Sequence, residues 1–405
     1  MGGRRSNNEG TAYRYRDEKG RPRYRAQWRV PDPASPDGPQ LRKSKAGFTT
    51  KKDALDYAAE MRAASRRGRP SPAATTVTLG EHATAWLAGH RAAASTLADY
   101  RRKYRLHIEP NLGAVELGKI RPTLLAALYR QLETGDPAGE KQPLGANTVR
   151  KVHDLLSVML QAAVDDGIIA TNPAQHPGAK PPRAREVKAA KPDIVVWVAG
   201  TLAAFLRWAE VEDPDMHALW QVAAGTGMRR SELCGLEWGD ISLKDGFLHV
   251  KRALTEVKTK GQPTAYVVGP TKNGRPRRIE LDDDLVHLLR AHRTDTAQLS
   301  FANVAPDARV FTLASGRMLR PDRATRRFEQ AVARFQRTRP SAPTITLHGL
   351  RHTHATLLLA DGEQPKVVQE RLGHETLAIT METYGHVLPG AHRAAAARFG
   401  RLLRG

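Results

Sequence analysis

The sequence predicts a multidomain chain, with a small α+β domain, an all-α domain and a mainly α, mixed α/β domain in that order. Aromatic and basic residues alternate near the N-terminus, which indicates strands. Apolar residues then recur at helical spacing through the middle of the chain. Beyond a stretch rich in proline, helical segments flank a β-rich centre. The 405 residues suffice for two or three domains of ordinary size.

The first predicted domain, residues 1–70, consists of a three-stranded sheet and one helix. The segment "TAYRYRDEKGRPRYRAQWRV" alternates around a turn and predicts a hairpin, and "LRKSKAGF" predicts a third strand. The helix that follows begins after Thr49 or Thr50, either of which can cap it. Its expected apolar stripe comprises Ala54, Leu55, Tyr57, Ala58 and Met61.

The charge of the chain indicates the kind of partner. There are 64 Lys and Arg against 42 Asp and Glu, a formal net charge of +22. Residues 1–70 alone hold 18 basic and 8 acidic side chains. Such an excess attracts polyanions, so double-stranded DNA is the leading partner and an anionic membrane the second. Basic residues interleaved with aromatics on a small sheet favour a DNA-groove reader over a merely solvated surface.

The second predicted domain, residues 79–173, is helical. Its second helix, "AASTLADYRRKYRLHIEPNLG", is expected to be capped by Ser95 or Thr96 and to end before Pro110. Linkers are predicted at residues 66–78 and, as an extended segment, at 172–192. The fourth helix has an apolar face formed by Val149, Val152, Leu155, Leu156, Met159, Leu160 and Ala163.

Several classes of protein are excluded by what the sequence lacks. Cys234 is the one cysteine, so no internal disulfide and no cysteine metal site can form. The N-terminus has no apolar segment of the secretory type, and no run of about 18 apolar residues predicts a membrane span. We therefore expect a cytoplasmic, nucleoid-associated protein with no membrane partner.

The third predicted domain, residues 185–405, carries two segments with candidate chemistry in its first half. In "AAGTGMRRSELCGLEW", a helix is expected to begin at Thr226-Gly227 and to place Arg229 and Glu232 on one face; alone, this is also the pattern of a surface ion pair. In "VVGPTKNGRPRRIEL", Asn273-Gly274 predicts a hairpin turn with Lys272 just before it. Lys258 and Lys260 lie in the same β-rich region and remain alternatives to Lys272.

Two further segments lie near the C-terminus. In "LHGLRHTHATLLLADG", His348 and Arg351 are three apart and share a helical face. In "LGHETLAITMETYGHV", Tyr384 follows His374 by ten residues, and nearby Leu377, Ile379 and Met381 are expected to pack. A zinc site is disfavoured because Arg351 stands where a metalloprotease motif has a carboxylate. We expect no metal and no cofactor, although the segments also contain His352, His354 and His386.

Together the segments supply two arginines, two histidines and a lysine. Such a cationic pocket suits a phosphoryl-transfer transition state, because its charge lies on oxygens that arginine binds bidentately. Fixed cations can then replace a metal ion. A tyrosine near them is a plausible covalent nucleophile.

The order "TGMRRSEL", a turn lysine, "HGLRHTHAT", "LGH" and "TYGHV" resembles the tyrosine recombinase, or phage integrase, family over the whole chain. The resemblance implies an arm-type DNA-binding domain in residues 1–70 and a helical core-binding, SAM-like domain in 79–173. It implies a catalytic domain in 185–405 with the mixed fold of this family.

The resemblance also implies roles for single residues. Tyr384 attacks the scissile phosphate and forms a 3′-phosphotyrosyl link, while Arg229 and Arg351 hold the non-bridging oxygens. Lys272 protonates the leaving 5′ oxygen, and His348 accepts the tyrosine proton. The remaining roles are a hydrogen bond from His374 to the phosphate and the orientation of Arg229 by Glu232.

On this basis the expected function is site-specific DNA recombination, as in the integrase of a phage or integrative plasmid, without ATP or metal. The expected partners are arm and core DNA sites, three further copies of the chain in a tetramer, a host DNA-bending factor and an excisionase. The alternatives are a type IB topoisomerase, a non-catalytic DNA-binding regulator and a metal-dependent nuclease.

Overall fold

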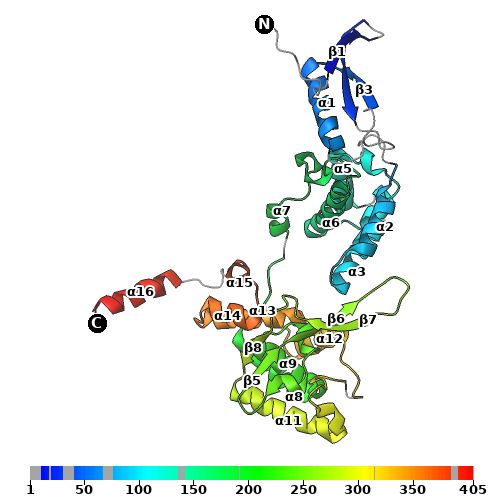
Figure 1. Cartoon of the computed structure of the whole chain (residues 1–405). Coiled ribbons are helices and arrows are strands. Elements are labelled where there is room, and N and C mark those ends of the chain that lie inside the picture. The colour runs from blue at the N-terminus through cyan, green and yellow to red at the C-terminus, as the bar shows by residue number, and fades with distance from the viewer. Residues whose placement is uncertain are drawn as a thin grey trace. The chain divides into compact units, whose positions relative to one another are not determined.

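The computed structural model describes residues 11–17, 20–30, 41–66, 76–135, 142–190, 192–313, 315–384 and 391–404 (Figure 1). Within these ranges the side chains at positions 30, 41, 63–66, 382–384, 391–395, 397 and 398 are not described. Contacts divide the chain into two compact units, residues 1–191 and 192–405. None of the helices in the described ranges is both long and apolar enough to span a membrane.

The N-terminal sheet forms as the alternation predicts. Strands β1 (Thr11–Arg16), β2 (Pro22–Val30) and β3 (Leu41–Phe48) pair antiparallel in that order. Helix α1 (Lys51–Arg66) packs on β2, and the Thr50 hydroxyl accepts a hydrogen bond from the Asp53 amide at 3.1 Å. Leu55 of the predicted stripe is only half-buried. The small core consists of Ala26, Trp28, Ala54, Ala58 and Met61.

The helical part of the first unit has its own core. Every residue of the predicted α6 face is buried. Thr78 and Glu81 form a capping box at the start of α2. A division of residues 1–191 into two domains stays a prediction. The helices are α2 (Leu79–Gly89), α3 (Ala94–Lys103), α4 (Glu109–Leu112), α5 (Pro122–Thr134), α6 (Ala146–Asp165) and α7 (Ala184–Ala189).

The expected cap of α3 is wrong. The N-cap of α3 is Ala93, and no side chain caps it, so neither Ser95 nor Thr96 has that role. Helix α3 ends at Lys103, before Pro110 as expected, and a π-helical turn at Tyr104–Ile108 then leads into α4, which has Pro110 in its first turn. A proline is accepted there since its missing N–H has no partner in a first turn.

The predicted extended linker at 172–192 is also wrong in part. Residues 173–175 and 177–179 form 3₁₀ turns. Asn172 caps the first turn by accepting a hydrogen bond from the Ala174 amide at 3.0 Å. Ala174 and Ala179 are buried in the helical core. The proline-rich segment therefore forms turns that pack on the helices.

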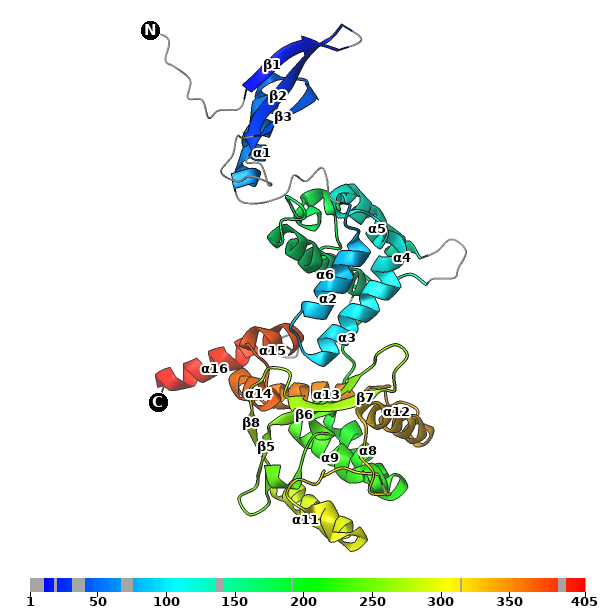
Figure 2. The ribbon, with the colours of Figure 1, turned by 45° about the vertical axis from the view of Figure 1, so that its right-hand side comes forward.

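The second unit consists of two small sheets among helices (Figure 1, Figure 2). Its helices are α8 (Ala199–Glu212), α9 (Pro214–Thr226), α10 (Arg230–Leu233), α11 (Asp283–Leu299), α12 (Pro321–Thr338), α13 (Leu347–Ala360), α14 (Pro365–Leu372), α15 (Leu377–Tyr384) and α16 (Ala391–Arg404). One sheet has the order β4 (Ile241–Ser242), β5 (Phe247–Val250), β8 (Arg277–Glu280), and the other pairs β6 (Arg252–Val257) with β7 (Ala265–Pro270).

This arrangement corrects the predicted hairpin. The turn at Asn273-Gly274 exists, because Gly274 has a φ of +64° and its amide bonds the Thr271 carbonyl at 2.8 Å. However, β7 and β8 belong to different sheets, so the turn connects the two sheets. The predicted start of a helix at Thr226-Gly227 is wrong too, since Thr226 ends α9 and Gly227 is its C-cap.

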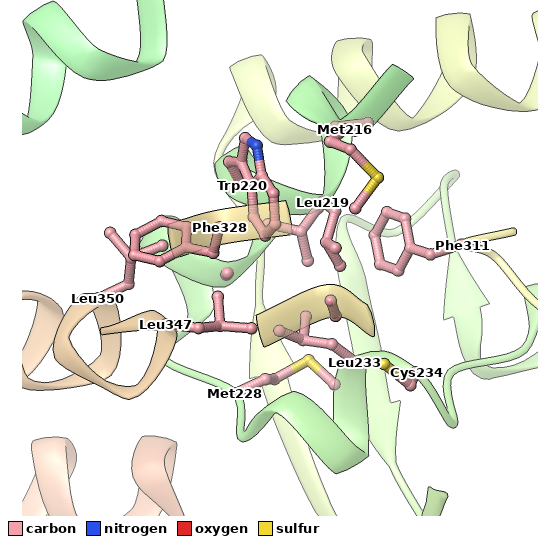
Figure 3. Close-up of a cluster of buried hydrophobic side chains, with 14 of the residues drawn as sticks. Met216, Leu219, Trp220, Met228, Leu233, Cys234, Phe311, Phe328, Leu347 and Leu350 are labelled. Carbon is pink, nitrogen blue, oxygen red and sulfur yellow. The ribbon is translucent and has the colours of Figure 1, made fainter. Parts of the chain in front are cut away.

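A large aromatic core fixes helix α13. The rings of Trp220 and Phe328 lie 5.1 Å apart, and Figure 3 shows them close to Leu347 and Leu350 at the start of α13. Both leucines are at most 5% exposed. Burial of these two residues orients the start of α13, which carries His348 and Arg351.

Cys234 belongs to the same core, and burial raises its pKa to about 12.

His354 links three helices. Its Nδ1 donates to the Ala224 carbonyl at the end of α9 at 2.8 Å, and its Nε2 accepts from Arg371 Nε of α14 at 3.1 Å. Both contacts require a neutral ring with the proton on Nδ1. Burial and the charge of Arg371 lower the pKa of His354 to about 4. Both views of the ribbon show α13 and α14 next to each other (Figure 1, Figure 2).

The chain should lose stability as the pH falls from about 6.5 to about 4, because His354 binds a proton in the unfolded state before it does in the folded state. This residue alone accounts for a loss on the order of 3 kcal/mol. In His354→Gln the loss between these pH values should be smaller, as urea unfolding measures it. His287→Gln, at an exposed position of α11, is the control. Equal losses in His354→Gln and the wild type would refute the prediction.

Gly227→Ala should destabilise the second unit by about 1–3 kcal/mol. Gly227 has a φ of +63°, and an added Cβ would lie 2.8 Å from both His354 Cδ2 and Leu372 Cδ2. Gly200→Ala, in the first turn of α8 with open space around it, should leave stability unchanged or raise it slightly. Urea midpoints compare the two, and equal midpoints would contradict the strain at Gly227.

Candidate active site

Arg229 is the N-cap residue of the short helix α10 and lines a cleft. Its amide and its NH1 each donate to Glu232, at 2.9 Å to Oε2 and 2.9 Å to Oε1. Its NH2 donates to the Gly373 carbonyl at 3.3 Å. The side chain is 22% exposed. Protein groups thus hold Arg229, while part of its side chain stays exposed at the cleft.

Glu232 has a second cationic partner that sequence reasoning missed. Arg277 NH1 and NH2 donate to its two carboxylate oxygens at 3.1 and 2.7 Å. Burial by itself raises the pKa of Glu232, but the hydrogen bond and charge of Arg277, with those of Arg229, lower it to about 2. The carboxylate is 1% exposed and stays charged. The sequence pattern indicated only the pairing of Glu232 with Arg229, and it does not say which further arginine lies near the carboxylate.

Arg351 is buried beneath the cleft surface. It is 2% exposed, and it donates from NH1 to the Gly227 carbonyl and from NH2 to the Leu372 carbonyl, both at 2.8 Å. It therefore joins the end of α9 to the end of α14. It is not among the residues that line the cleft in the described structure.

The last turn of α14 collects three arginines through consecutive carbonyls. Arg277 Nε donates to the carbonyl of residue 371 at 2.9 Å, and Arg351 and Arg229 bond the next two. Carbonyls at a helix C-terminus lack helical partners and carry the negative end of the helix dipole. Gly373 is the C-cap with a φ of +65°, and an added Cβ would lie 2.9 Å from Arg277 Cδ. The "LGH" motif is thus a site where cations are fixed.

Lys272 lies in the same cleft, which has a volume of about 480 Å³. The next residue, Asn273, donates to the Gly373 carbonyl at 2.9 Å. Lys258 pairs with Glu256 at 3.0 Å, and neither it nor Lys260 is among the described lining residues. The residues lining the cleft are Arg229, Thr271, Lys272, Asn273, Arg275, Pro276, Arg277, Lys366, Gln369, Glu370, Gly373, His374 and Glu375.

The two candidate histidines are neutral near pH 7. His374 is half-buried and its Nδ1 lies 2.8 Å from the Thr380 hydroxyl. Burial, then the charges of Arg351 and Arg229, lower its pKa to about 4. The pKa of His348 is also lowered to about 4, by desolvation of its ring and by nearby His352, Arg351 and Arg229. Neutral rings can accept a proton or donate one hydrogen bond.

The nucleophile candidate is described only in part. Tyr384 is the last residue of α15, one turn after Thr380, and its side chain lies outside the described residues, as does His386. Thr380 is fully buried, so its contact with His374 attaches α15 to the cleft. The expected packing of three apolar α15 residues is wrong, because all three are exposed: Leu377, Ile379 and Met381.

His348 has a further histidine, His352, as its neighbour on α13. The rings of His348 and His352 meet edge to face with centroids 4.7 Å apart. In the part of the chain that is described, no three His, Cys, Asp or Glu residues are grouped as metal ligands.

Comparison with known proteins identifies the family of the chain. Residues 204–390 match the phage integrase family. A tyrosine recombinase XerC-like protein of Caldanaerobacter subterraneus is 26% identical over 77% of this chain and 80% of its own length. The integrase of Mycobacterium phage FRAT1 is 28% identical over 76% of this chain and 84% of its own.

Solved structures share the fold. A Tn1549 transposon integrase in complex with transposon right end DNA has a TM-score of 0.65 and 19% identity, over 80% of this chain and 100% of that one. A lambda integrase tetramer bound to a Holliday junction has a TM-score of 0.54 and 18% identity, over 90% and 95%. The chain belongs to the phage integrase family and is a tyrosine-type site-specific recombinase.

Proposed function

We propose that this recombinase cuts and rejoins DNA through a 3′-phosphotyrosyl intermediate, as the integrase of a mobile element. The observation that carries the proposal is the cleft, where Arg229, Lys272 and His374 come together from segments far apart in the sequence. We assign the catalytic roles to Arg229, Lys272, His348, Arg351, His374 and Tyr384, with Glu232 orienting Arg229.

The proposed step is a balanced exchange of phosphoesters. The Tyr384 oxygen forms a bond to phosphorus and gives its proton to neutral His348. The bond from phosphorus to the 5′ oxygen breaks, and Lys272 protonates that oxygen. The energy of the phosphodiester is kept in the protein–DNA link, so the step needs no ATP, and the cations supply the charge that a metal would.

Preorganisation supports this assignment. Arg229, Arg351 and Arg277 are fixed by carbonyls of one helix end before any phosphate arrives. Fixed donors stabilise charge that develops in a transition state without first having to reorganise. The exposed part of Arg229 remains available for a phosphate oxygen.

We further propose the domain roles and partners. Residues 1–70 bind arm-type DNA, residues 79–173 form the core-binding domain and residues 185–405 form the catalytic domain. The net charge of +22 supports a large phosphate interface whose affinity falls steeply with salt. The working assembly is a tetramer on two DNA sites, assisted by a host DNA-bending factor and an excisionase. The lambda integrase tetramer bound to a Holliday junction supports the tetramer by analogy.

Tyr384→Phe should abolish covalent attachment to DNA, because phenylalanine has no nucleophilic oxygen. A nicked substrate carrying the junction sequence of the element is incubated with the protein in EDTA, and a denaturing gel measures the adduct. The wild type should form an adduct at Tyr384 on a 3′ phosphate. Cleavage that requires Mg²⁺ would instead indicate a nuclease, and relaxation without exchange between two sites a topoisomerase.

Lys272→Ala should slow adduct formation by at least about 100-fold, which is the lower end of what general acids contribute. A substrate with a bridging 5′ sulfur should restore the rate, because a thiolate leaves without protonation. Lys258→Ala is the matched control and should react like the wild type on both substrates. A slow Lys258→Ala with a normal Lys272→Ala would move the acid to Lys258.

A further inference from the structure

Arg277 uses every nitrogen of its guanidinium to join three parts of the catalytic unit. NH1 and NH2 form a bidentate pair with Glu232, and Nε bonds the carbonyl of residue 371. The side chain is 10% exposed. Bidentate pairing with a carboxylate fixes both orientation and distance. Lysine cannot reproduce this planar fork.

Arg277 lies directly beside the turn that carries Lys272, so its contacts help to hold that turn. Arg277 is the first residue of β8, directly after the turn 271–276 that carries Lys272. The other anchor of the turn is Asn273, which bonds the Gly373 carbonyl. Both anchors lie on the last turn of α14. The strands on either side of the turn, β7 and β8, do not pair with each other, because they belong to different sheets. Its position therefore depends on these two attachments.

The same carboxylate that holds Arg277 also holds Arg229. Glu232 Oε1 accepts from Arg229 NH1 and from Arg277 NH1, and Oε2 accepts from the Arg229 amide and from Arg277 NH2. A displacement of Arg277 must then disturb the link between the turn and the phosphate-binding arginine. Because Gly373 has no Cβ, the Arg277 side chain has room to pass it and reach Glu232.

We infer that Arg277 is a positioning residue that sets the place of Lys272 relative to Arg229, and so the place of the general acid relative to the bound phosphate. The chemical part of this inference rests on the proposed role of Lys272. The structural part, that Arg277 holds the turn 271–276, does not.

The chemical test compares Arg277→Met with the wild type on suicide substrates with a 5′-bridging oxygen or a 5′-bridging sulfur. On oxygen, Arg277→Met should be at least about tenfold slower, because a misplaced acid loses much of its effect. On sulfur it should come within about threefold of the wild type. Arg278→Met is the control and should be normal on both, since its exposed side chain pairs with Glu280.

Equal slowing of Arg277→Met on both substrates, or no slowing on either, would overturn the inference. If Arg277→Met does not fold, Arg277→Lys replaces it, because that variant keeps the charge beside Glu232 but loses the fork. Failure of sulfur to rescue Lys272→Ala would reject the proposed acid and leave the structural part to be judged separately.

That structural part is tested by trypsin, which cleaves after the exposed Lys272. In Arg277→Met, and in Arg277→Lys, cleavage between Lys272 and Asn273 should be at least about threefold faster than in the wild type, since the turn opens more often. Mass spectrometry identifies the cut, and Arg278→Met again serves as the control. An unchanged rate in the Arg277 variants would overturn the inference, whatever the activity assay gives.

Discussion

The catalytic unit depends on the bonds between arginine side chains and the last turn of α14. Three consecutive carbonyls, of residues 371 to 373, accept hydrogen bonds from Arg277, Arg351 and Arg229. Cations gathered so closely repel one another, and Glu232 is the buried carboxylate that offsets this repulsion. The helix end and the carboxylate together keep a positive site assembled in the absence of DNA.

The same device appears at the end of α9. Its last carbonyls accept from His354, from Arg371 and, at Gly227, from Arg351. Hydrogen bonds from side chains of α13 and α14 thus connect these helices to the end of α9. The aromatic core that packs against α13 fixes the position of that helix. The packing of α13 and the placement of its charged residue depend on each other, because burial of Leu347 and Leu350 also sets the orientation of Arg351.

Sequence predicted the elements whose signals are local. The α6 face and the three N-terminal strands follow from periodicity, and the candidate residues of the cleft follow from motif order. The partner of Glu232 could not be predicted in this way, because Arg277 lies 45 residues further along the chain. The turn at Asn273-Gly274 was recognised from its residues, but which strands pair across it depends on long-range sheet order, which no dipeptide encodes. The apolar residues of α15 are exposed for a similar reason, because whether a helix face is covered depends on long-range packing that a short sequence motif does not encode.

The single thiol of this chain has a practical value. Cys234 is buried in the core, and its raised pKa leaves almost no reactive thiolate at neutral pH. The native sequence is therefore already a suitable background for labelling. A cysteine introduced on the surface would be the one site that reacts with a maleimide dye. A fluorophore could then be attached to the N-terminal sheet or to α16 and followed as the protein assembles on DNA, with no native residue replaced beforehand.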